Sequence, residues 1–132
     1  MSASPADRPQ DPSVELDLSE GFVRIGAAGQ ASFALFAETW TAMVEHPDFV
    51  PGLNALWDLR SVGLGRLPSA EMRRMVEWAS VRGPRRGNAR VAILVGTDVD
   101  FGMARVAAAI SDGQGVQMRV FREEAAAREW VA

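Results

Sequence analysis

Six polar side chains of this sequence have the types that bind small ligands, and they follow three segments that are expected to be strands. They comprise two carboxylates, two hydroxyls and two guanidinium groups: Asp58, Arg60, Ser61, Thr97, Asp98 and Arg122. Because ligands of open α/β sheets usually bind beyond the carboxyl ends of the parallel strands, these positions predict a weak site for a small polar ligand. The alternative is ordinary surface chemistry, in which Asp98 caps a helix and Asp58 pairs with Arg60. We favour the alternative, since no nucleophile is accompanied by a base.

Residue types that support catalysis or metal binding are scarce in this chain. The absence of Cys excludes disulfides and thiolate chemistry. The single His46 has no second His and no Cys to help it hold a zinc ion, and it lies near the end of a predicted helix. We therefore expect no catalytic residue, no metal, no cofactor and no enzymatic activity.

Ser69 is a candidate phosphorylation site at the predicted start of a helix, directly after Pro68. A phosphate there would interact favourably with the helix N-terminus. Ser is also among the residues preferred as helix N-caps, and this simpler role is favoured. The sequence thus predicts that Ser69 is a cap and not a switch.

Two further patterns are weak. Gly63-Leu-Gly65 lacks the third glycine of a dinucleotide-binding fingerprint. Arg82, Arg85, Arg86 and Arg90 make one loop basic and could bind an acidic partner, but a solvated loop is the favoured interpretation, because all fourteen basic residues of the chain are Arg. The net charge of -3 argues against binding of nucleic acid.

Hydrophobic patterning predicts five strands. Alternation favours a hairpin of Val14–Leu18 and Phe22–Gly26, after which Gly26 to Gly29 breaks the pattern. Near-continuous apolar runs predict parallel strands that are buried on both faces, at Leu53–Leu59, Arg90–Val95 and Val116–Phe121.

Helical spacing predicts four helices between and after these strands. The expected buried stripe of the first is Phe33, Phe36, Ala37, Trp40 and Val44, and that of the second is Met72, Met75, Val76 and Ala79. The third helix begins at Thr97-Asp98 with the stripe Val99, Met103, Val106, Ala107 and Ile110, and the last spans Glu123 to Val131.

The resulting order, ββαβαβαβα, predicts one α/β domain over residues 14–132 with helices on both faces of a mixed, mostly parallel five-stranded sheet. Met1–Ser13 contains three prolines and is predicted to be a disordered tail that can be deleted without unfolding the domain. It lacks the apolar region of a signal peptide, and no apolar run approaches the roughly 18 residues of a membrane span. The expected location is cytoplasmic.

Several short strings, in this order, resemble the STAS/SpoIIAA-like domains and in particular the bacterial branch described as STAS/SEC14-like. They are His46-Pro-Asp-Phe49, Pro51-Gly52-Leu53, Trp57-Asp-Leu-Arg60, Arg90-Val-Ala-Ile-Leu-Val95, Phe101-Gly-Met-Ala-Arg105 and Val120-Phe-Arg122 leading to Trp130. The resemblance implies a SpoIIAA-like βα superhelix, but it brings no settled activity with it.

Two related groups suggest functions. Anti-sigma factor antagonists carry a phosphorylated Ser in the motif Asp-Ser-Ser/Thr-Gly, which is absent here, since the matching stretch reads Leu64-Gly-Arg-Leu-Pro-Ser69. SEC14-like carriers hold lipids in an apolar pocket between sheet and helices, and this chain lacks the extra helices that build that pocket in them.

Apolar and basic residues that miss the predicted buried stripes indicate a contact surface on the second and third helices: Trp78, Val81, Phe101, Arg105 and Ala108. The alternative, which has equal weight, is that Trp78 covers the edge of the core and Phe101 packs on a neighbouring loop. We therefore predict a non-catalytic binding module that acts through a protein partner or a homodimer. The competing hypothesis is a carrier or sensor of a small apolar or amphipathic ligand. An apolar patch on the outer helices would favour the first hypothesis, and a cavity beneath them the second.

Overall fold

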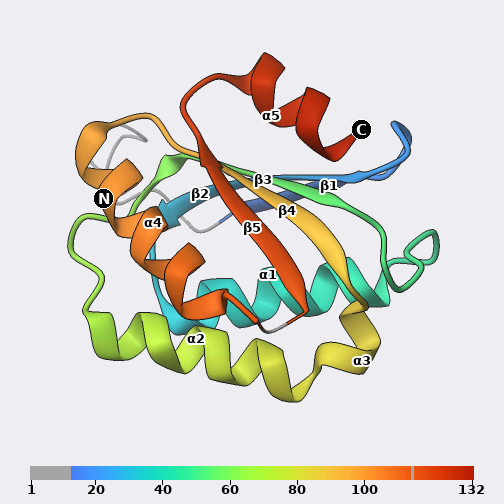
Figure 1. Cartoon of the computed structure of the whole chain (residues 1–132), viewed down its shortest axis with the longest axis horizontal. Helices are drawn as coiled ribbons and strands as arrows, with labels where there is room; N and C mark the ends of the chain where they lie inside the picture. Colours follow the sequence, from blue (N-terminus) through green and yellow to red (C-terminus); the bar gives the residue numbers. More distant parts are fainter. Residues whose placement is uncertain (1–12, 114) are drawn as a thin grey trace, which may run out of the picture.

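The computed structural model describes residues 13–113 and 115–132, which form a five-stranded sheet with helices on both faces (Figure 1). The strands are β1 (Ser13–Asp17), β2 (Val23–Gln30), β3 (Ala55–Gly63), β4 (Ala89–Leu94) and β5 (Val116–Phe121). They lie in the order β1-β2-β3-β4-β5. β1 is antiparallel to β2, and all other neighbours are parallel. The predicted α/β class, the hairpin and the three parallel strands are confirmed.

The helices are α1 (Phe33–Glu45), α2 (Ser69–Val81), α3 (Gly83–Arg86), α4 (Asp98–Ser111) and α5 (Glu124–Val131). Figure 1 shows α1, α2 and α4 on one face of the sheet and α5 on the other. The short α3 was not predicted from the sequence. Among the described residues, no helix has the length and apolar character that crossing a membrane requires.

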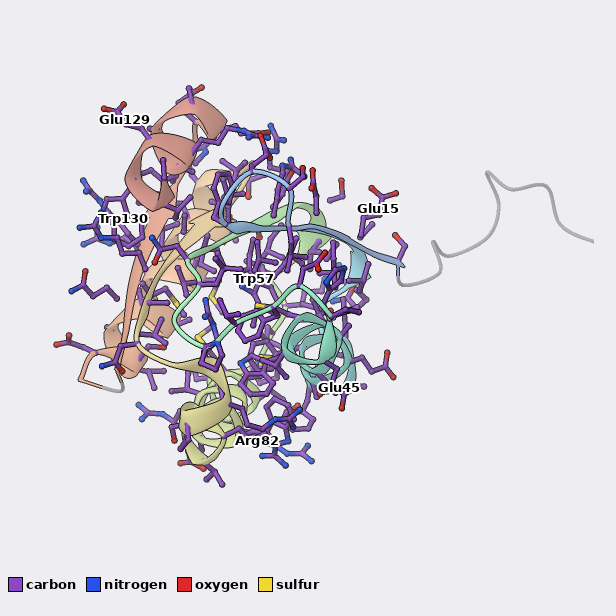
Figure 2. The ribbon with its side chains drawn as sticks, turned by 90° about the vertical axis from the view of Figure 1, so that its right-hand side faces the viewer. Glu15, Glu45, Trp57, Arg82, Glu129 and Trp130 are labelled. Atoms are coloured by element: carbon purple, nitrogen blue, oxygen red, sulfur yellow. The ribbon has the colours of Figure 1, made fainter. Side chains whose placement is uncertain are left out.

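The sheet separates two hydrophobic cores. The larger one, between the sheet and helices α1, α2 and α4, includes Ile25, Met43 and Trp57, and Figure 2 shows Trp57 near the centre of the molecule. The smaller one lies under α5 and packs Ala127 and Val131 against Leu56, Ala92, Leu94 and Phe22. Strands buried on both faces explain the near-continuous apolar runs of β3 and β4.

Two strands extend further than predicted. β2 continues through Gly26–Gly29 to Gln30, because these small residues still pair with β1 and β3. β3 begins two residues later than expected and runs to Gly63, so Ser61 lies within the strand and not in a loop. The pairing of β2 with β3 shifts by one residue between Asp58 and Ser61, which is a β-bulge.

Ser13, the last residue of the predicted tail, already pairs with Ala28 in β1. Met1 to Pro12 lie outside the described residues, and the deletion experiment stays a prediction.

The predicted buried faces of two helices are partly wrong. On α1 the buried residues are Leu35, Thr39, Trp40 and Met43. Phe33 packs against Trp78 of α2, whereas Phe36 contacts both Trp78 and Trp57 of β3. On α4 the side chains of Val99 and Val106 are exposed, whereas Asp100, Ala104 and Ser111 are buried. The two valines thus lie outside the buried face, whereas Met103, Ala107 and Ile110 of the predicted stripe are half-buried.

Candidate functional site

The predicted polar residues of β3 belong to an ion-pair network that joins the sheet to α5. Asp58 Oδ2 accepts one hydrogen bond from Nη2 of Arg24 and one from Nη2 of Arg60, and both donor–acceptor distances are 2.8 Å. Glu124 Oε1 accepts from the same two nitrogen atoms at 3.2 and 2.8 Å, and its Oε2 accepts from Arg128 Nε at 2.7 Å. The simple pairing of Asp58 with Arg60 that we favoured is present, within this larger network.

The network neutralises its own charges. Hydrogen bonds from Arg60 hold the pKa of Asp58 below its ordinary value, and those from Arg24 do the same for the pKa of Glu124. The carboxylates in turn raise the pKa values of Arg24, Arg60 and Arg128. Each guanidinium group therefore already has an anionic partner from the protein, which leaves little charge for a ligand.

The remaining predicted ligand residues form a second group at the same edge of the sheet. Arg122 pairs with Asp98, and its Nη2 donates to the carbonyl oxygen of Gly96 at 3.2 Å. Thr97, and not Asp98, is the N-cap of α4, because its Oγ1 accepts from the backbone N–H of Asp100 at 3.1 Å. Asp58 and Arg60 thus belong to one group within β3, and Asp98 and Arg122 belong to another, with the charges paired inside each group.

The predicted cap role of Ser69 is wrong. Pro68 holds the N-cap position of α2, no side chain caps this helix end, and Ser69 is the exposed first residue of the helix. The backbone of Pro68 is extended, with φ of -63° and ψ of 146°, so the helix begins only at the next residue. Phosphorylation of Ser69 stays an untested prediction.

Both aromatic residues of the predicted contact surface make contacts within the domain. Trp78 lies between α1 and α2, with its ring centroid 5.1 Å from that of Trp40 and 6.0 Å from those of Phe33 and Phe36. Phe101 is partly buried and packs against the larger core, so both aromatic side chains pack within the domain, as the alternative to a contact surface expected. Val81 is 79 % exposed and Arg105 is exposed, as expected.

A cavity of about 250 Å³ lies between the sheet and helices α1, α2 and α4. Its walls are mainly apolar and include Trp40, Trp57 and Leu59. The bulge in β3 places Leu59 and Val62 on the same wall although three positions separate them. Five of the six methionines of the sequence line this cavity, namely Met43, Met72, Met75, Met103 and Met118. The yellow sulfur atoms of Figure 2 accordingly lie in the interior of the molecule.

Arg86 is the one charged side chain among the described residues that line the cavity. Only 4 % of it is exposed, and neither Nη1 nor Nη2 has a hydrogen-bond partner in the described part of the chain. The ring of Phe49 lies 5.5 Å from the guanidinium carbon. Burial lowers the pKa of Arg86 to about 10, so the group is still cationic at neutral pH.

Arg86 is buried because two loops meet at α3. The backbone N–H of Gly52 donates to the Arg86 carbonyl oxygen at 2.8 Å. Gly87 follows with φ of +72°, and a Cβ there would collide with the backbone of Pro51 and Gly52. The prediction of a solvated basic loop is therefore wrong for Arg86, whereas Arg85 and Arg90 are exposed. The Gly residues at 52 and 87 were the sequence signal for this close approach.

Comparison with known proteins identifies the type of fold. The chain is similar to the crystal structure of an uncharacterized DUF3478-family protein with a SpoIIAA-like fold from Shewanella loihica. The TM-score is 0.59 at 15% sequence identity, and the match covers 100% of this chain and 99% of that one. No protein-family model matches the sequence, and no curated protein is significantly similar to it. The resemblance to SpoIIAA-like domains is thus confirmed as a fold.

Proposed function

We propose that this SpoIIAA-like domain is a non-catalytic binding module whose ligand is a small, largely apolar molecule held between the sheet and helices α1, α2 and α4. The cavity of about 250 Å³ in that position is the observation that carries the proposal. It exceeds the roughly 150 Å³ of an engineered apolar cavity that binds benzene. It approaches the roughly 300 Å³ at which ordinary small-molecule pockets begin.

The composition of the walls supports a ligand-binding role. Unbranched methionine side chains adapt to ligands of different shape, which makes them common at surfaces that accept varied apolar partners. Small residues on α4, Ala104 and Ala107, leave the space that larger residues would fill. The extra helices of SEC14-like carriers are therefore not required for a cavity in this fold.

A binding role also fits the polar atoms of the cavity. The hydroxyl of Thr39 donates to the Leu35 carbonyl oxygen at 2.6 Å, and that of Ser111 donates to the Ala107 carbonyl oxygen at 2.8 Å. Both hydroxyls are thus committed to their own helices, and neither is directed at a general base.

Two measurements test the proposal. Native mass spectrometry of freshly purified protein is expected to detect a bound small molecule. The ligand-free protein is then titrated with 1-decanol, a neutral apolar probe, and tryptophan emission is followed. Since the sequence has no Tyr and Trp40 and Trp57 line the cavity, saturable changes in emission are expected.

A matched pair of variants on α4 locates the binding. Ala104→Phe fills the cavity wall and is expected to abolish binding of 1-decanol, whereas Ala109→Phe on the exposed side of the same helix is expected to leave it unchanged. Equal binding by both variants would place the probe elsewhere and refute the proposal.

Contact with a protein partner, our first hypothesis from the sequence, stays a prediction with reduced support. Its aromatic anchors, Trp78 and Phe101, pack within the domain. A cytoplasmic location likewise stays a prediction from the sequence.

A further inference from the structure

We propose that Arg86 binds the anionic head of the ligand, and that the ligand is an amphipathic monocarboxylate whose apolar body fills the cavity. This inference rests on the proposed function, because it names the ligand class of the same cavity.

The first support is the isolation of a buried charge. A charge that leaves water without a partner is costly, and buried charges in proteins are normally paired. The neighbouring basic residues find partners in the described structure: Arg85 lies 3.7 Å from Glu45, and Arg82 covers the ring of Trp78 at 4.0 Å. Arg86, which is buried deeper than either, pairs with no carboxylate of the described residues. The fold thus maintains a cation inside an otherwise uncharged cavity wall.

The second support is the geometry of the guanidinium group. Both terminal nitrogens, Nη1 and Nη2, are buried, and neither has a partner among residues 13–113 and 115–132. A guanidinium fork with two free nitrogens matches the two oxygens of a carboxylate and donates two parallel hydrogen bonds to it. A neutral hydroxyl head would satisfy only part of this donor set.

The third support is the charge balance. One buried cation compensates one negative charge, so a monocarboxylate leaves the cavity neutral, whereas a phosphate dianion would bring an uncompensated charge into it. Asn88, which is exposed, lines the cavity two residues after Arg86. The polar head would therefore lie at the end of the cavity that reaches the surface, with the methionine-lined walls around the apolar body.

The test compares three probes with the same apolar chain and different heads: decanoate, 1-decanol and decyl phosphate. Each is titrated into the ligand-free full chain at neutral pH, and the dissociation constants are obtained from tryptophan emission and calorimetry. We expect decanoate to bind at least tenfold more tightly than 1-decanol, and more tightly than decyl phosphate.

Variants assign the preference to Arg86. Arg86→Met is expected to remove the preference for decanoate while 1-decanol binds as well as before or better. Arg86→Lys, which retains the charge without the fork, is expected to retain part of the preference. Arg85→Met, an exposed neighbour in the same helix, is the control and should bind all probes as the wild type does.

The outcomes separate the two proposals. Equal binding of decanoate and 1-decanol by the wild type overturns the role of Arg86 and leaves the proposed function intact. Tighter binding of decyl phosphate contradicts the monocarboxylate class. Failure of every probe to bind refutes the proposed function and this inference together. The wild-type comparison needs no variant, so an Arg86 variant that does not fold would not prevent a decision.

Discussion

On the α5 face of the sheet, Arg24 and Arg60 pair with carboxylates of the protein. On the opposite face Arg86 is among the residues that line a cavity, and its buried Nη1 and Nη2 have no hydrogen-bond partner among the described residues. The α5 face packs Ala127 and Val131 directly on the strands. The other face encloses about 250 Å³ of space beneath its helices. The difference indicates that the arginines of the α5 face are structural, since their charges are paired, whereas the isolated buried Arg86 lies at the cavity that we propose as the binding site.

Arginine replacement should have opposite effects on the two faces, and this is the largest difference that we expect. Arg86→Met removes an unpaired buried charge and should raise the free energy of unfolding of the ligand-free protein by about 2 kcal/mol. Arg24→Met removes a partner of Asp58 and Glu124 and should lower that free energy by about 1 kcal/mol. Urea denaturation measures both values. A decrease for Arg86→Met would mean that the guanidinium is satisfied in the ligand-free protein, and the comparison between the faces would fail.

Adding the same side chain to both faces tests their packing. Ala104 and Ala127 are 4 % and 0 % exposed, and only Ala104 lines the cavity. Ala127→Leu overfills a packed interface and should lower the free energy of unfolding by about 2 kcal/mol. Ala104→Leu enters existing space and should change it by less than about 1 kcal/mol in either direction. Thermal and urea denaturation of the pair provide the comparison, and similar losses in both variants would argue that the cavity side is as tightly packed as the α5 side.

Acid should weaken the paired network selectively. The pKa values of Asp58 and Glu124 lie below their ordinary values of 3.8 and 4.5 in the folded protein, so the unfolded chain binds more protons in that range. The stabilisation is therefore complete above pH 4.5 and is lost as the pH falls through the lowered values. Asp58→Asn should be about 1 kcal/mol less stable at pH 7 and should lose less on acidification than the wild type. Parallel pH profiles for the two proteins would show that Asp58 does not contribute to the acid sensitivity.

Much of the fold follows from the sequence. A strand that is covered on both faces of the sheet has a continuous apolar run, and such runs identified the parallel strands in the sequence. The final strand was predicted at Val116–Phe121, as observed. The extension of β2 through Gly26–Gly29 was missed, because glycine and alanine carry no strand preference and pair only when neighbouring strands are present. Part of the face of α4 was misjudged, because the small Ala104 is buried in the core while the larger Val99 and Val106 are exposed.

The candidate site was the less predictable part. Asp58 and Arg60 were expected at the end of a strand and lie within β3. Their pairing partners, Arg24 and Glu124, come from β2 and α5, and distant partners leave no local pattern. Arg86 is indistinguishable by type from the exposed arginines beside it. Its burial depends on the approach of Gly52 to Gly87, which are 35 positions apart in the sequence. A cavity is a property of the packed structure, and the one hint of it was the number of methionines on facing elements.

The most direct test of the cavity as a binding site is a titration of methyl-labelled methionines, followed by NMR, with 1-decanol as the probe. The methyl groups of Met43, Met72, Met75, Met103 and Met118 line the cavity from four different elements and are expected to shift together and to saturate at one equivalent of ligand. Ala104→Phe should suppress all five shifts. If the five resonances stay unchanged at concentrations of 1-decanol that saturate the tryptophan response, the ligand binds outside the cavity and the account is contradicted.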